Sequence, residues 1–169
     1  MAEREATRTK EAEAKPVQLY EQLMDMWRSA RERAKTGKVV VRGKEQPWED
    51  CRQGHARWYL HDNMPDVAVR GWFVFMQDLH SHSGKHVHQG GLAIYIVEGQ
   101  GYTVIDGVKY EWEGGDLLLL PIKPHGVEHQ HFNTHLSMNT KWIGLIYGPF
   151  FDAMGDELEQ KENQPGYHG

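Results

Sequence analysis

The sequence contains one cysteine, Cys51, among its 169 residues. This excludes a disulfide framework and a cysteine-rich metal site, and it favours a reducing compartment, so we expect a cytoplasmic protein. No segment approaches the ~20 apolar residues of a transmembrane helix, so we expect no membrane role. The formal net charge of -5 lacks the basic excess typical of proteins that bind nucleic acid, so we expect no such partner.

Histidine, by contrast, is abundant and unevenly placed. The chain has 11 histidines, and most of them lie between His80 and His135. Solubility does not require histidine, whereas metal binding and proton transfer both use its imidazole ring. The clustering therefore indicates a chemical site in this part of the chain.

The composition divides the chain into four parts. Residues 1–15 are almost entirely charged residues and alanine, which predicts a disordered tail. Residues 16–37 carry apolar side chains at helical spacing and predict one amphipathic N-terminal helix. Residues 38–151 predict a β-barrel, and residues 152–169 predict a peripheral C-terminal tail.

The central part consists of short segments that are typical of strands. The stretch from Val67 to Leu79 is rich in β-branched and aromatic residues, and shorter runs follow it between Gly and Asp. Asp106-Gly107 is a strong signal for a two-residue hairpin. Many short strands without interleaved helices indicate an all-β protein, an antiparallel sandwich or barrel.

His86 and His88 are the first candidate metal ligands. Residues two apart on a strand face the same side, about 7 Å from each other, so both imidazoles can reach one ion. Iron, manganese, nickel and zinc all accept neutral imidazole. The spacing alone does not distinguish this pair from two others of the same kind, which are His80 with His82 and His129 with His131.

The surrounding motifs distinguish it. The first motif consists of His86, His88, Glu98, Gly99, Gly101 and Gly107. The second consists of Gly115-Asp116, a hydrophobic strand, Pro121, and a run from Pro124 to Asn133. Together they resemble the two motifs of the cupin superfamily. The resemblance implies a jelly-roll barrel, also called a double-stranded β-helix, that holds one divalent metal ion.

Two departures from the cupin pattern affect the metal site. The family normally places a glutamate ligand a few residues after the histidine pair, and here that position is Leu92. About three extra residues interrupt the second motif just before its run from Pro124 to Asn133, so the third ligand is either His129 or His125. Spacing to Gly126 favours His129, which we prefer, whereas spacing to Gly115-Asp116 favours His125.

An all-histidine site leaves the +2 charge of the ion uncompensated, so it should attract a bidentate anionic substrate such as a catecholate, hydroxycarboxylate or enolate. In this the chain resembles the gentisate-type dioxygenases and other three-histidine cupin dioxygenases. The resemblance implies Fe(II), dioxygen as co-substrate and cleavage of a C–C bond, with Mn, Ni or Zn as other candidate metals. Two alternatives remain: a non-oxidative metal-dependent lyase or isomerase, and a cupin that binds a small ligand without turnover.

Further residues are assigned around this site. His131 shares the face of His129 and is the candidate proton-transfer residue, although a purely structural role is an equal interpretation. Gln89, Leu92 and Ile94 are candidate substrate-binding residues. Cupin relatives commonly dimerise through sheet edges, so the resemblance implies a homodimer, and the N-terminal helix could cover such an edge.

Overall fold

The computed structural model describes residues 18–155 and 157–169. The predicted tail at 1–15 lies outside the described residues, as do the first two residues of the predicted helix at 16–37. The chain divides into two units, Met1–Gly37 and Lys38–Gly169, and each is described by itself.

In the first unit the structure describes residues 18–37, and these form the helix α2 (Leu19–Thr36), as predicted. It ends at Gly37, whose extended backbone (φ -68°, ψ 154°) leaves the helical region while its N–H donates to the Arg33 carbonyl (2.8 Å). Leu19, Leu23 and Met26 recur along the helix, and none of its residues is buried. No helix among the described residues is both long enough and apolar enough to span a membrane.

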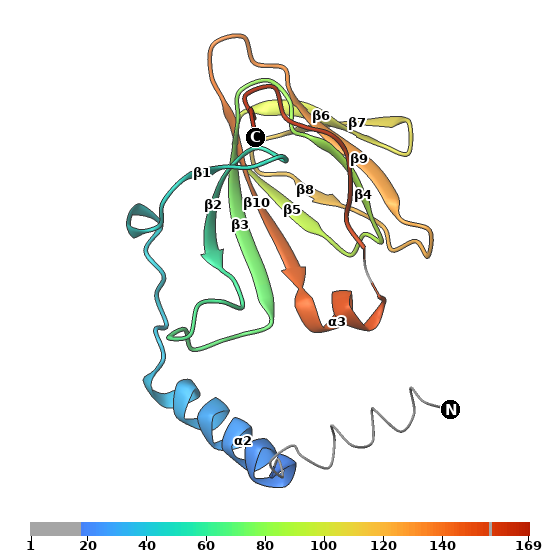
Figure 1. The fold of residues 1–169 in the computed structure, drawn as a ribbon. Coiled ribbons are helices and arrows are strands. Elements are labelled where there is room, and N and C mark those ends of the chain that lie inside the picture. Colours follow the sequence, from blue (N-terminus) through green and yellow to red (C-terminus); the bar gives the residue numbers. More distant parts are fainter. Residues whose placement is uncertain (1–17, 156) are drawn as a thin grey trace, which may run out of the picture. The chain divides into compact units, whose positions relative to one another are not determined.

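The second unit consists of two antiparallel sheets that face each other (Figure 1). The six-stranded sheet has the order β1 (Glu49–Asp50), β2 (His55–Leu60), β3 (Trp72–Leu79), β10 (Thr140–Tyr147), β5 (Ala93–Glu98) and β8 (Leu117–Leu119). The five-stranded sheet has the order β11 (Glu159–Glu162), β4 (Lys85–His88), β9 (Val127–Asn133), β6 (Gln100–Ile105) and β7 (Val108–Glu113). The short helices are η1 (Gly43–Glu45) and α3 (Gly148–Ala153). The all-β architecture with an N-terminal helix is therefore confirmed.

The core fills the space between the sheets because each strand alternates its side chains. Ile94 and Ile96 of β5 are almost fully buried, whereas Tyr95 between them is 45% exposed. Trp142 of β10 joins them in the hydrophobic core. The predicted hairpin is present at Asp106-Gly107, where both residues have positive φ (48° and 81°), as its two-residue turn requires.

The segment expected to be a peripheral tail, 152–169, is instead part of the barrel. Its strand β11 pairs with β4, and Gln160 lies opposite His86. The sequence of β11 is Glu-Gln-Lys-Glu, which has no apolar alternation because this edge strand buries almost no side chain. Its backbone hydrogen bonds hold it in the sheet, and these leave no signal in a hydrophobic pattern.

Candidate metal centre

Three buried histidines converge inside the barrel. His86 and His88 lie on β4, and His129 lies on β9 directly opposite His86. One ring nitrogen of each lies within 4.8 Å of those of the other two. All three side chains are at most 6% exposed. Strand alternation places the β4 pair on one face, and the antiparallel register then brings the third ring to the same place.

The alternative third ligand, His125, lies elsewhere. It is exposed in the turn before β9, between Pro124 and Gly126. Gly126 has a φ of +86°, and a Cβ there would crowd Val87, so the turn requires glycine. The extra residues within the second motif lead into this turn, and the strand that follows carries His129 into the barrel.

Burial keeps the three rings neutral. Desolvation lowers the pKa of His86 to about 2, with further contributions from the neighbouring histidines. Desolvation likewise lowers the pKa values of His88 and His129 to about 4. Neutral imidazole is the form that binds metal, so near pH 7 the cluster offers nitrogen lone pairs without competing protons.

A hydrogen bond of the His129 ring determines which of its two nitrogens can bind a metal. Its Nδ1 lies 3.0 Å from the Val127 carbonyl oxygen, which can only accept, so Nδ1 carries the ring proton. The lone pair is then on Nε2, which is buried and has no hydrogen-bond partner among the described residues. A backbone carbonyl that fixes the tautomer in this way is typical of metal-binding histidines.

At His88 the backbone N–H of Gly90 donates to Nδ1 (3.0 Å). A metal bound at Nε2 would place the ring proton on Nδ1, so this contact must shift when a metal binds. The three rings together fit a divalent metal that accepts imidazole nitrogen.

The family comparison agrees with this geometry. The cupin domain family matches residues 73–145, from β3 to β10. The chain carries a cupin domain. No curated protein sequence matches the chain.

Solved structures share the cupin fold at low sequence identity. Pac13 of Streptomyces, determined with uridine, is 11% identical with a TM-score of 0.54, over 75% of this chain and 94% of that one. The polyketide cyclase RemF of Streptomyces resistomycificus is 15% identical with a TM-score of 0.51, over 78% of this chain and 87% of that one. Salicylate 1,2-dioxygenase of Pseudoaminobacter salicylatoxidans, in complex with gentisate, is 23% identical with a TM-score of 0.51. The match spans 86% of this chain but only 39% of the dioxygenase chain.

The structure agrees with the sequence that the glutamate ligand of the cupin pattern is absent. Leu92, at the usual glutamate position, is 3% exposed and belongs to the hydrophobic core. Glu98 is exposed and pairs with Lys141 (2.6 Å). Among the described residues, no carboxylate belongs to the three-histidine group.

Behind the cluster lies a chain of buried polar groups. Trp112 Nε1 donates to Thr103 Oγ1 (2.9 Å), which lies 2.8 Å from His131 Nδ1. Because the Thr103 oxygen already accepts from Trp112, the Thr103 hydroxyl proton is left to donate to His131 Nδ1. The neutral His131 ring then carries its own proton on Nε2. The His131 ring centroid lies 5.5 Å from that of His129.

Sequence reasoning found His131 but missed Thr103 and Trp112. The register of three strands brings them together: Thr103 of β6 lies opposite His131 of β9, and Gly101, two residues earlier, lies opposite Trp112 of β7. Alternation along Gly101, Thr103 and Ile105 was a usable signal, because it predicts that Thr103 faces inwards.

The other predicted site residues lie in different surroundings. Ile94 is fully buried in the hydrophobic core. Gln89 is half-buried, and its side-chain oxygen accepts a hydrogen bond from the Glu157 backbone N–H (3.0 Å). A residue that sequence reasoning missed, Phe151 of α3, lies with its ring centroid 5.5 Å from that of His88. The helix at the barrel end therefore contributes an apolar wall beside the cluster.

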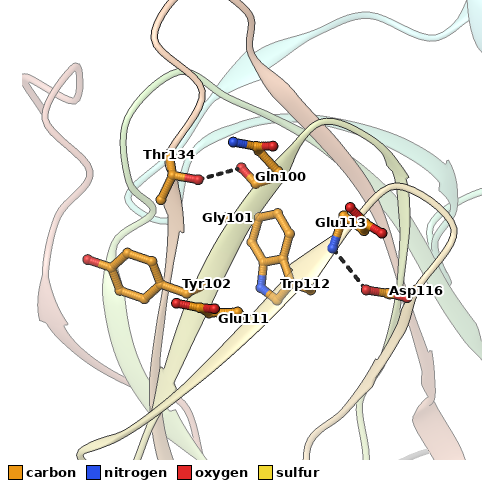
Figure 2. Close-up of a pocket in the computed structure, with 8 residues that line it drawn as sticks. All are labelled: Gln100, Gly101, Tyr102, Glu111, Trp112, Glu113, Asp116 and Thr134. Carbon is orange, nitrogen blue, oxygen red and sulfur yellow. Dashed lines mark hydrogen bonds between the residues drawn. The ribbon is translucent and has the colours of Figure 1, made fainter.

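A separate surface hollow of about 580 Å³ lies over the β6–β7 hairpin (Figure 2). Tyr102, Glu111 and Trp112 line it, together with residues of the turn that follows β7. In that turn the Glu113 backbone N–H donates to Asp116 Oδ2 (2.9 Å). None of the predicted site residues lines this hollow, so it is distinct from the histidine cluster.

Proposed function

We propose that the chain is a metal-dependent cupin enzyme, and that it is an Fe(II) dioxygenase acting on a substrate that chelates through two oxygen atoms. One observation carries the proposal: His86, His88 and His129 converge without a carboxylate among the described residues. A bound Fe(II) would supply Lewis-acid chemistry and dioxygen activation. Mn, Ni and Zn suit the same ligands and are alternatives.

The ligand set favours a particular kind of substrate. Three neutral imidazoles leave the full +2 charge of the ion uncompensated, whereas a glutamate at the position of Leu92 would cancel part of it. In a buried site this charge attracts anions strongly, because the local dielectric constant is low. Catecholates, hydroxycarboxylates such as gentisate, and enolates match this requirement.

The remaining residues of the site supply shape and a proton. Phe151 places an apolar ring beside His88, and we propose that Leu92 and Ile94 of the hydrophobic core form the apolar part of the substrate pocket. His131 would present an N–H at Nε2, since Thr103 occupies Nδ1. We propose that this N–H donates to an oxygen of the bound substrate.

A non-oxidative reaction is the alternative, because an uncompensated charge also stabilises an enolate. Two of the solved structures with this fold are named for such chemistry: Pac13 as a nucleoside dehydratase and RemF as a polyketide cyclase. These likenesses concern the fold, so the two reactions must be separated by experiment.

The test is anaerobic reconstitution with Fe(II), followed by oxygen-electrode assays with gentisate, catechol and a 1,2-diketone. We expect oxygen uptake that depends on both iron and substrate. His129→Ala should abolish it, and His125→Ala, which alters an exposed histidine, is the matched control and should retain it. Product formation that continues under nitrogen would refute the dioxygenase and favour a lyase or isomerase. A protein that binds metal but converts nothing would be a binding module.

A further inference from the structure

A row of aromatic rings leads away from the histidine cluster across the six-stranded sheet. The His131 ring lies 4.9 Å from the ring of Trp142 of β10, centroid to centroid. Trp142 contacts Phe75 of β3 (5.9 Å), which contacts Trp58 of β2 (5.0 Å). The three strands are neighbours in the sheet (Figure 1). All three distances lie within the ~4.5–7 Å of rings in direct contact, so this aromatic row is continuous.

The inner face of the sheet is built to hold the row. Phe75 lies opposite Gly144 of β10, where a Cβ would come within 2.7 Å of the Phe75 ring. The missing side chain leaves room for the Phe75 ring over β10, beside Trp142. Farther along the same face, β5 contributes the aliphatic side chains Ile94 and Ile96 instead. The aromatic rings are therefore concentrated on the half of the sheet that extends from the cluster towards β2.

Trp142, the first indole of the row, is a poor place for a positive charge. It is 2% exposed, and its Nε1 has no hydrogen-bond partner among the described residues. Removal of one electron from an indole produces a cation that releases its Nε1 proton. At Trp142 that proton has no acceptor, and a buried charge without a partner is costly. A positive charge formed on this ring should therefore move to a ring that holds it at lower cost.

Trp58, at the other end of the row, is such a ring. Its Nε1 donates to Glu49 Oε1 (2.5 Å). The carboxylate attracts a positive charge on the indole and can accept its proton. Trp58 also lines a surface hollow of about 400 Å³, together with Pro47, Glu49 and Met64. A small reductant in solution can therefore reach this end of the row.

We propose that the aromatic row conducts electrons from Trp58 to the metal centre when an oxidant reacts there without substrate. The inference rests on the Fe(II) binding of the proposed function. A centre that reacts with an oxidant while no substrate is bound otherwise damages its own histidine ligands. Phe75, whose ring is harder to oxidise than an indole, serves only as the contact between Trp142 and Trp58.

The electrons and protons balance with hydrogen peroxide as the oxidant. Its O–O bond breaks as it accepts one electron from Fe(II) and one from Trp142, which Trp58 replaces. With two protons from solvent, the peroxide leaves as two water molecules. Trp58 becomes a neutral radical, because its Nε1 proton passes to Glu49. A reductant such as ascorbate then returns one electron at the hollow, and the proton on Glu49 returns to Nε1.

The test treats the anaerobic Fe(II)-loaded protein with hydrogen peroxide in the absence of substrate and maps oxidised tryptophan by peptide mass spectrometry. We expect Trp58 to be the main site of oxidation. Trp27 and Trp72 are internal controls, because they are 49% and 37% exposed, more than Trp58, and attack from solution would oxidise them first. Electron paramagnetic resonance of rapidly frozen samples should detect a tryptophan radical, and ascorbate should suppress both signals.

Two variants test the two ends of the argument. Glu49→Gln should lower the oxidation of Trp58 by roughly tenfold or more, because a neutral amide neither attracts the charge nor accepts the proton. Glu49 is exposed, so the fold should tolerate this change. Glu45→Gln alters another exposed carboxylate and is the matched control, which should change nothing. Phe75→Leu removes the connecting ring and should shift oxidation from Trp58 to Trp142, and circular dichroism verifies that this core variant is folded.

Metal analysis before peroxide is added separates two kinds of failure. An iron-loaded protein that oxidises Trp27 and Trp72 in preference to Trp58 overturns this inference and leaves the metal centre of the proposed function standing. Equal oxidation of Trp58 in Glu49→Gln and in the wild type also overturns it. So does oxidation of Trp58 that persists in His129→Ala, because the oxidant then acts from solution. A protein that holds no iron overturns the proposed function and this inference together.

Discussion

The buried chain from Trp112 through Thr103 to His131 predicts an unusually large effect for the substitution Thr103→Val. The two side chains have the same shape, so the change leaves no cavity. It removes only the hydroxyl, which accepts from Trp112 Nε1 (2.9 Å) and contacts His131 Nδ1 (2.8 Å).

The magnitude follows from the burial of the groups left behind. Thr103 is fully buried, and Trp112 and His131 are 6% and 2% exposed. Water cannot replace the lost hydroxyl, so Trp112 Nε1 and His131 Nδ1 are each left buried without that hydrogen bond. Each such nitrogen lowers the free energy of unfolding by about 1–3 kcal/mol. We therefore expect the free energy of unfolding to fall by about 3 kcal/mol, which corresponds to roughly 6–12 °C in Tm for a chain of this length.

Urea denaturation at constant pH measures the change, and an unchanged m-value shows that it reflects stability alone. Thr134→Val is the matched control, because that hydroxyl is exposed, and it should change the free energy by no more than ~0.5 kcal/mol. The substitution should cost about half as much in a Trp112→Phe background, where one stranded donor is absent. A loss below ~0.5 kcal/mol, or an equal loss in both backgrounds, would refute the reasoning.

Three further predictions concern stability. The pKa values of His88 and His129 are about 4 in the folded chain, below their ordinary 6.5, so the unfolded chain binds more protons between these values. The metal-free protein should therefore lose about 1.4 kcal/mol per pH unit for each ring as the pH falls from 6.5 to 4, measured by urea midpoints at successive pH values. A flat profile would contradict the neutral, buried rings. Gly101→Ala should destabilise the barrel by roughly 3 kcal/mol or more in the same assay, because its Cβ would overlap the Phe132 carbonyl oxygen. Gly114→Ala, whose nearest neighbour would lie at 3.4 Å, should cost less than ~1 kcal/mol, and equal losses would contradict this packing. Adding Co(II) at 100 times its Kd should raise the free energy of unfolding by about 2.7 kcal/mol, an effect that His129→Ala and chelator should both remove.

The barrel and the β4 ligand pair were predictable because both follow from local alternation. A period of two places His86 and His88 on one face, and it separates Ile94 and Ile96 from Tyr95. These rules need only neighbouring residues, so one sequence is enough to apply them.

Features that depend on long-range register were harder to predict. The choice between His125 and His129 depends on the turn at Gly126, which determines where β9 begins. The contact of Thr103 with His131 depends on the pairing of β6 with β9, and strand β11 depends on backbone hydrogen bonds alone. Spacing within a motif cannot supply these pairings, because each joins segments far apart in the chain.

The central claim is that three histidines inside the barrel hold one divalent metal ion. The most direct test is anaerobic titration of the metal-free protein with Co(II), followed by visible absorption and by metal analysis after dialysis. The account predicts about one bound equivalent for the wild type and for His125→Ala, and none for His86→Ala, His88→Ala or His129→Ala. A wild-type protein that retains no metal, or a His125→Ala variant that loses it while His129→Ala retains it, would contradict the account.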